Sequence, residues 1–139
     1  MKRNEPIKTI MSPDVTTVNV THKLSEVRRL MAEQGIHHVP VVSGRKLVGM
    51  LSATDMVRLS YSAYGTDERA VDAMLDHEFS VEKVMQTDLV TIKTSESVRE
   101  AARILRAGQF HSLPVVDEEQ TLAGIVTSTD LIRYLYDQY

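Results

Sequence analysis

The residues best suited to chemistry lie in a run that occurs twice, at positions 49–55 (GMLSATD) and 124–130 (GIVTSTD). Each run ends in an aspartate, Asp55 and Asp130, and a carboxylate can accept both vicinal hydroxyls of a ribose. The hydroxyl residues of the two runs are Ser52, Thr54, Thr127 and Thr129. At a helix N-terminus such hydroxyls could help to hold a phosphate. The same residue types also cap helices, so ligand binding and capping both stay open.

A pair of histidines repeats in the same way, His37 in residues 36–42 (IHHVPVV) and His111 in residues 110–116 (FHSLPVV). A protonated imidazole there could donate to an anion. The alternative is a partly buried imidazole bonded to backbone. By ligand type, His37, His38 and His111 could hold zinc, but no i, i+4 pair or carboxylate spacing supports a metal site, and none is predicted.

These runs belong to an internal repeat that covers most of the chain. Residues 11–42 align with 85–116 and residues 45–58 with 120–133, with 14 identities over 46 positions. Average composition would give roughly three identities by chance. Each half is short enough to be marginal alone, so two copies are expected to cover each other's apolar faces.

Each repeat is predicted to run strand, helix, strand, strand, helix. β-Branched runs at 16–18 and 90–92 indicate strands, and apolar stripes at 24–31 and 98–105 indicate helices. Two hairpins are expected, at 39–52 and 113–127, followed by helices that open at Thr54 and Thr129. Ser97 and Glu100 have the spacing of a capping box. Between the repeats, residues 67–75 are expected to form a connecting helix.

Together, the repeated strand–helix–strand–strand–helix pattern, the His-x-h-Pro-Val-Val strand and the Gly-h-h-Ser/Thr-x-Thr-Asp run resemble the cystathionine-β-synthase (CBS) domain, here in tandem. The resemblance implies an α/β (α+β) fold of two pseudo-symmetric β-α-β-β-α repeats packed sheet to sheet. It divides the chain into repeat 1 (7–61), a helical linker (62–80) and repeat 2 (81–136).

The family is known for regulatory modules that bind adenosine nucleotides in clefts between the two repeats. This implies an adenosine-containing ligand (AMP, ADP, ATP or a relative) with no required cofactor, and an effector protein of unknown identity. Free-standing members commonly form homodimers, so a homodimer is expected. The alternative is a ligand-free oligomerisation or docking module.

The resemblance also assigns roles to residues. Asp55 and Asp130 would hold the ribose. Phosphate or hydroxyl contacts would come from Ser52, Thr54, Thr127, Thr129, His37 and His111. The adenine pocket would be formed by Val15, Thr16, Val39, Pro40, Leu89, Val90, Leu113 and Pro114. For the last set, ordinary strand core is the alternative. A nucleotide-sensing family member carries arginine where this chain has His38 and Ser112, which implies a weaker grip on phosphate or a less charged ligand.

Five of the seven aromatic residues are tyrosines near the ends of the second helices, at positions 61, 64, 134, 136 and 139. Tyrosine is favoured at protein interfaces because its ring is apolar and its tip polar. These residues could therefore build the dimer, or they could cap the core of each half.

Composition excludes several classes of function. The 139 residues hold 16 Lys+Arg against 19 Asp+Glu and no cysteine, which argues against a nucleic-acid partner and removes thiol chemistry. No apolar run approaches the length of a membrane span, so a soluble, cytoplasmic protein is expected. No activated serine, metal cluster or glycine-rich phosphate loop is present, so catalytic residues and enzymatic turnover are not expected.

Overall fold

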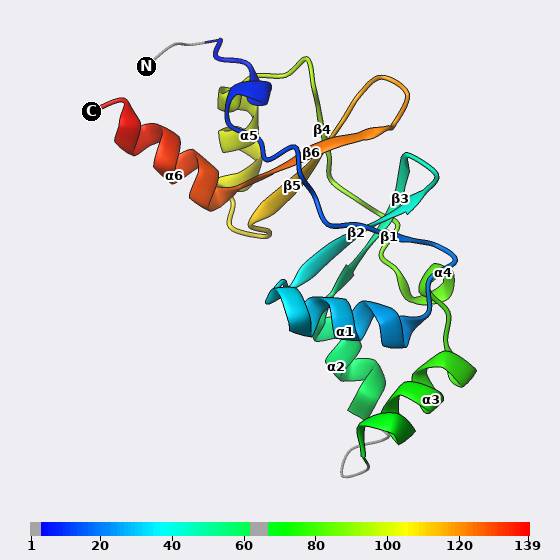
Figure 1. Cartoon of the computed structure of the whole chain (residues 1–139). Helices are drawn as coiled ribbons and strands as arrows, with labels where there is room; N and C mark the ends of the chain where they lie inside the picture. Colours follow the sequence, from blue (N-terminus) through cyan, green and yellow to red (C-terminus); the bar gives the residue numbers. More distant parts are fainter. Residues whose placement is uncertain (1–3, 62–66) are drawn as a thin grey trace. The chain divides into compact units, whose positions relative to one another are not determined.

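The computed structural model (Figure 1) describes residues 4–61 and 67–139. The chain forms two compact units. Unit 1 contains the chain up to Val15, residues 45–47 and residues 90–139, and unit 2 contains residues 16–44 and 48–89. Each unit is described by itself.

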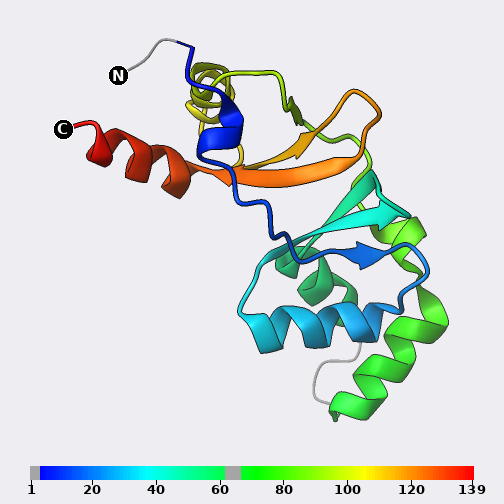
Figure 2. The ribbon, with the colours of Figure 1, turned by 45° about the horizontal axis from the view of Figure 1, so that its top comes forward.

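Unit 2 is built on a three-stranded sheet in the order β1-β2-β3, with β1 parallel to β2. Its strands are β1 (Val18–Asn19), β2 (His38–Ser43) and β3 (Lys46–Ser52), the first residues of β3 being counted with unit 1. Its helices are α1 (Leu24–Gln34), α2 (Ala53–Ser60), α3 (Glu68–Glu78) and α4 (Val81–Val84). Figure 2 shows α3 running beside α1.

Unit 1 repeats this plan with a second sheet in the order β4-β5-β6, where β4 is parallel and β6 antiparallel to β5. Its strands are β4 (Ile92–Lys93), β5 (Ser112–Val116) and β6 (Leu122–Thr127). Its helices are α5 (Val98–Leu105), α6 (Ser128–Asp137) and the short 3-10 helix η1 (Ile7–Thr9). The described chain is therefore the mixed α/β fold of two β-α-β-β-α repeats that the sequence predicts.

Each unit has its own apolar core, formed where the helical stripes meet the sheet. Leu24, Val27, Val41 and Leu51 are fully or almost fully buried in unit 2, and α3 adds Leu75. In unit 1 the corresponding cluster includes Ile92, Ala101, Leu113, Val115 and Val126. The predicted connecting helix is confirmed. It begins one residue later than expected because Asp67 is its N-cap, the Asp67 carboxylate accepting from the backbone N–H of Ala70 (2.8 Å), and it extends past the expected end to Glu78.

The segment before each repeat's first strand pairs with a hairpin strand of its compact unit. Ser12 and Ile125 exchange two backbone hydrogen bonds (2.8 and 3.0 Å) in unit 1, and Met50 and Gln86 do the same (3.0 and 2.9 Å) in unit 2. Ile7 is consequently buried in the core of unit 1, although the sequence places it at the start of repeat 1. The compact units and the expected repeats are thus drawn at different boundaries, and the repeat boundaries stay a prediction.

This pairing explains why the repeated runs 49–55 and 124–130 both begin with glycine. A Cβ added at Gly124 would lie 2.8 Å from the backbone oxygen of Ser12, and one at Gly49 would collide with Met85. Only glycine lets the paired segment approach so closely.

Candidate functional site

The first candidate site lies where β3 passes into α2. The helix begins at Ala53, one residue before the predicted start, because Ser52 is the N-cap. The N–H of Asp55 donates to the Ser52 hydroxyl (3.0 Å), and the N–H of Ser52 donates to Oδ2 of Asp55 (3.3 Å). This reciprocal pair is a capping box, so the capping interpretation of Asp55 is correct as local geometry.

The second site repeats this arrangement at the start of α6. The N–H of Asp130 donates to the Thr127 hydroxyl (3.1 Å), and the N–H of Thr127 donates to Oδ2 of Asp130 (2.8 Å). The predicted opening residue Thr129 again lies inside the helix, which starts at Ser128. Thr54 and Thr129 are both exposed, whereas Ser52 and Thr127 are half-buried.

An arginine that the sequence analysis did not single out completes each site. Arg58 Nη1 lies 3.8 Å from Oδ1 of Asp55, and Arg133 Nη1 lies 3.5 Å from Oδ1 of Asp130. The carboxylate side chains are 15% and 11% exposed and the guanidinium side chains 74% and 68%. The repeat alignment held the signal, since Asp-x-x-Arg is identical in both halves and i, i+3 spacing puts both groups on one helix face.

Each predicted histidine joins the same site through its backbone. The carbonyl of His37 accepts from the N–H of Ala53 (2.8 Å), and the carbonyl of His111 accepts from the N–H of Ser128 (2.9 Å). These bonds place the residue just before β2 or β5 against the N-terminus of the second helix of its repeat. Both imidazoles are exposed, so the partly buried imidazole of the alternative interpretation is wrong. Histidine, capping hydroxyl, aspartate and arginine are thus contributed within one unit, once in each.

The residues assigned to the adenine pocket fall into two groups. The strand residues of the set are buried, which agrees with the alternative that they belong to the strand core: Val39, Pro40, Leu113 and Pro114. The others lie at two of the places where the chain passes between its compact units, Val15 to Thr16 and Leu89 to Val90. Val90 is 46% exposed, while the Thr16 hydroxyl is bonded to Oε1 of Gln34 (2.8 Å). Their role toward a ligand stays a prediction.

Two cavities lie close to these elements. One of about 300 Å³ in unit 1 is lined by both Asp130 and Arg133, beside Thr9, Ile10 and Tyr134. Asp130 therefore faces a space that a small group could enter.

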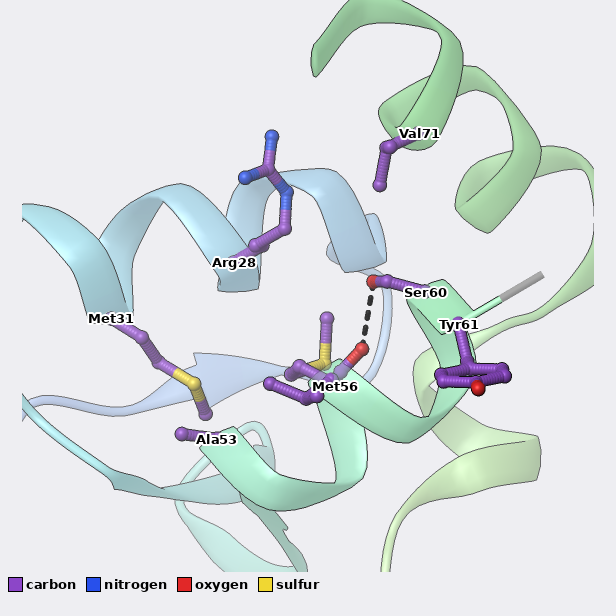
Figure 3. Close-up of a pocket in the computed structure, with 8 residues that line it drawn as sticks. Arg28, Met31, Ala53, Met56, Ser60, Tyr61 and Val71 are labelled. Atoms are coloured by element: carbon purple, nitrogen blue, oxygen red, sulfur yellow. Dashed lines mark hydrogen bonds between the residues drawn. The ribbon is translucent and has the colours of Figure 1, made fainter. Parts of the chain in front are cut away.

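The larger cavity, about 530 Å³, lies between α1, α2 and α3 of unit 2 (Figure 3). Its walls are mainly apolar, formed by Met31, Met56, Val57 and Val71, and none of the predicted ligand residues lines it. Arg28 stands at its edge. Burial disfavours the charged guanidinium, but hydrogen bonds to Asp72 and Glu68 outweigh this and raise the pKa of Arg28.

Two classes of site are not found in the part of the chain that the structure describes. Among residues 4–61 and 67–139, no three His, Asp or Glu side chains are grouped so that they could hold a metal ion. In the same residues no helix has the length and apolar character required to cross a membrane.

The chain is thus a two-repeat module in which each repeat carries one aspartate in a capping box at the start of its second helix. The family model described as CBS domain matches residues 7–62 and 81–137. The chain belongs to the CBS domain family.

Known relatives agree with this membership. The CBS domain-containing protein YhcV of Bacillus subtilis is 31% identical over 125 residues, which cover 90% of this chain and 81% of YhcV. The protein MJ1225 of Methanocaldococcus jannaschii is 30% identical over 132 residues, 94% of this chain. The chain spans 47% of the length of MJ1225, and 41% and 22% of the lengths of two further curated relatives.

Solved structures share the fold. The crystal structure of MJ1225 has a TM-score of 0.81 at 28% identity, over 97% of this chain and 49% of that one. The cytosolic domain of the Mg²⁺ channel MgtE, solved in complex with ATP, has a TM-score of 0.71 at 26% identity, over 94% of this chain and 48% of that one.

Proposed function

We propose that this chain is a regulatory module that binds an adenosine-containing nucleotide through the aspartate–arginine sites of α2 and α6. The observation that carries the proposal is the duplication of one constellation, a half-buried carboxylate with an exposed arginine at a helix N-terminus. A purely structural cap would require the aspartate but not the arginine.

The two carboxylate oxygens of Asp130 have different partners. Oδ2 of Asp130 accepts from the N–H of Thr127 at 2.8 Å, whereas among the described residues the polar contact of Oδ1 is the long 3.5 Å one to Arg133. An ion pair of that length to an exposed side chain contributes little. A ribose diol can therefore take Oδ1 without breaking the cap, and the released guanidinium can turn to a phosphate.

Support for the ligand class comes from the family. MgtE's cytosolic domain, 26% identical to this chain, was solved with ATP. A ligand of this kind acts on an effector only through different affinities for two states of the module. We propose that the effector reads that difference and that the module performs no turnover itself.

The test is calorimetric titration of ATP, AMP and S-adenosylmethionine into the chain and into the double variant D55A/D130A. At least one ligand is expected to bind the unmodified chain and to lose tenfold or more of its affinity in the variant. The control is D67A, which removes the capping carboxylate at the N-terminus of α3. Unchanged affinity in D55A/D130A contradicts the assignment.

A ligand-free oligomerisation module is the second candidate, and exposed apolar side chains on α2 and α6 favour it. Val57 lies in α2 and Tyr61 is the C-cap residue of α2. On α6 the exposed apolar side chains are Ile132, Leu135 and Tyr136. Tyr139 is also exposed. Tyr134 is buried, which agrees with the alternative that these tyrosines cap the core of each half. Tyr64 lies outside the described residues. Since large exposed apolar groups mark interfaces, we propose that these surfaces pair in a homodimer whether or not ligand is bound.

Sedimentation of the variant Y61S/Y136S tests the dimer. We expect a lower mass than for the unmodified chain at equal concentration, with Y139S as a control at the chain end. A monomeric unmodified chain, or an unchanged dimer in Y61S/Y136S, argues against these surfaces.

A further inference from the structure

Three exposed arginines lie along one side of α5 and its end: Arg99 and Arg103 in the helix and Arg106 at its C-cap. Their spacing of four and three residues puts them on one helix face. Ala102 lies among them, and together with Glu96 and Glu100 they line a groove of about 470 Å³. This row is called the α5 basic face.

Of the three arginines, only Arg103 has a carboxylate partner within residues 4–61 and 67–139. Arg103 donates to the Glu100 carboxylate (2.6 Å), and that hydrogen bond lowers the pKa of Glu100 and raises the pKa of Arg103. Arg99 and Arg106 form no ion pair with any residue in 4–61 or 67–139. The face therefore presents two uncompensated cations beside one that is paired.

The internal repeat shows what covers this face in the other half. In the alignment Ser25 corresponds to Arg99, Arg28 to Ala102 and Arg29 to Arg103. On α1 these positions lie under α3: Ser25 is buried and Arg28 is half-buried, whereas Arg99 and Ala102 are exposed.

The covering helix is held by carboxylates. Glu68, Asp72 and Asp76 are spaced four residues apart on α3, and all three bond to α1. Arg28 Nη2 donates to Asp72 (2.7 Å) and to Glu68 (3.0 Å), and the Ser25 hydroxyl donates to Asp76 (2.6 Å). Between these contacts, Leu75 is fully buried in the core of unit 2.

We propose that the α5 basic face docks an amphipathic helix of a partner protein that carries carboxylates at i and i+4, as α3 does on α1. Charge complementarity selects an acidic partner, and the fold of the other repeat shows that this side of the first helix accepts a helix. Ala102, small and exposed, provides the floor on which such a helix rests. A nucleic acid is disfavoured because the chain is acidic overall.

The experiment uses the full chain, labelled with ¹⁵N, and a peptide of this chain's own residues 67–79 with blocked ends as the acidic helix. Amide shifts are expected in residues 97–107. Affinity is expected to fall at least tenfold for the variant R99E/R106E and to stay within twofold for the matched control R45E/R69E, whose arginines are exposed elsewhere. A peptide with Asp72 and Asp76 replaced by Lys is expected to recover binding to R99E/R106E.

Four results would overturn the proposal. They are no amide shifts at millimolar peptide, shifts confined to α1, equal binding of a scrambled peptide of the same composition, and equal binding of a single-stranded DNA of the same charge. The last would indicate a general polyanion surface rather than a helix dock.

Discussion

Asp76 provides a sharp test of how carboxylates hold α3 on α1. Its Oδ1 accepts the backbone N–H of Ser25 (3.0 Å) and its Oδ2 accepts the Ser25 hydroxyl (2.6 Å). Ser25 is 7% exposed and lies in the first turn of α1, where its N–H has no partner within the helix. One side chain of α3 therefore satisfies two donors of α1.

The variant D76A leaves both donors without a partner. A buried donor left unsatisfied costs about 1–3 kcal/mol, and the half-buried position of this pair selects the lower end, about 2 kcal/mol for the two together. In a chain of this length the melting temperature is then expected to fall by roughly 8 °C.

The assay is urea unfolding followed by circular dichroism for D76A, S25A and S25A/D76A. Ser25→Ala is expected to destabilise the unmodified chain by about 1 kcal/mol but to be neutral in D76A, because it removes the orphaned hydroxyl. The exposed Asp88, replaced by Ala, is the control and is expected to stay within about 0.5 kcal/mol of the unmodified chain. Additive effects of S25A and D76A would refute the reasoning.

Three further perturbations test other parts of the structure. Gly124→Ala is expected to cost about 1–3 kcal/mol in urea unfolding, because the new Cβ would lie 2.8 Å from the backbone oxygen of Ser12; a neutral variant would show that this pairing is looser than described. Leu75→Ala, at a fully buried position of α3, is expected to cost about 2–5 kcal/mol, and a loss under 1 kcal/mol would place α3 outside the core. By carboxyl NMR titration Glu100 is expected to have a pKa below its ordinary value, because Arg103 donates a hydrogen bond to its carboxylate. The small contribution of this pair to stability is therefore present above the unfolded-state pKa and is lost as the pH falls through the folded-state pKa. The pKa of Glu100 should rise in R103Q, and an unchanged value would contradict the pair.

The order and type of the strands and helices in each repeat could be predicted because both follow from the local spacing of apolar residues. Apolar stripes mark α1 and α5, and the repeat checks one half against the other. Boundaries were less certain: the first strands are shorter than predicted, since only Val18–Asn19 and Ile92–Lys93 pair with a neighbour.

The pairing of Ser12 with Ile125 of β6 could not be predicted from local pattern. Ser12 contacts Ile125, more than a hundred positions away, and nothing in either segment encodes that choice. Such pairings depend on the assembled sheet.

Capping shows how neighbouring side chains change a predicted contact. Ser97 and Glu100 have the capping-box spacing, and the Ser97 hydroxyl does accept from the N–H of Glu100 (3.2 Å). The Glu100 carboxylate instead bonds to Arg103, so only half of the box forms. At the candidate sites the aspartates could be predicted from sequence, and the only sign of Arg58 and Arg133 was the repetition of Asp-x-x-Arg in both halves.

The most direct test of the central claim is thermal unfolding of the chain with AMP, ADP, ATP, NAD(H) and S-adenosylmethionine. A ligand at 100 times its dissociation constant adds about 2.7 kcal/mol of stability, a rise of roughly 10 °C in a chain of this length. We expect such a rise for at least one of these ligands, and its loss in D55A/D130A. A flat panel for the unmodified chain would contradict nucleotide binding and leave the oligomerisation module as the function to pursue.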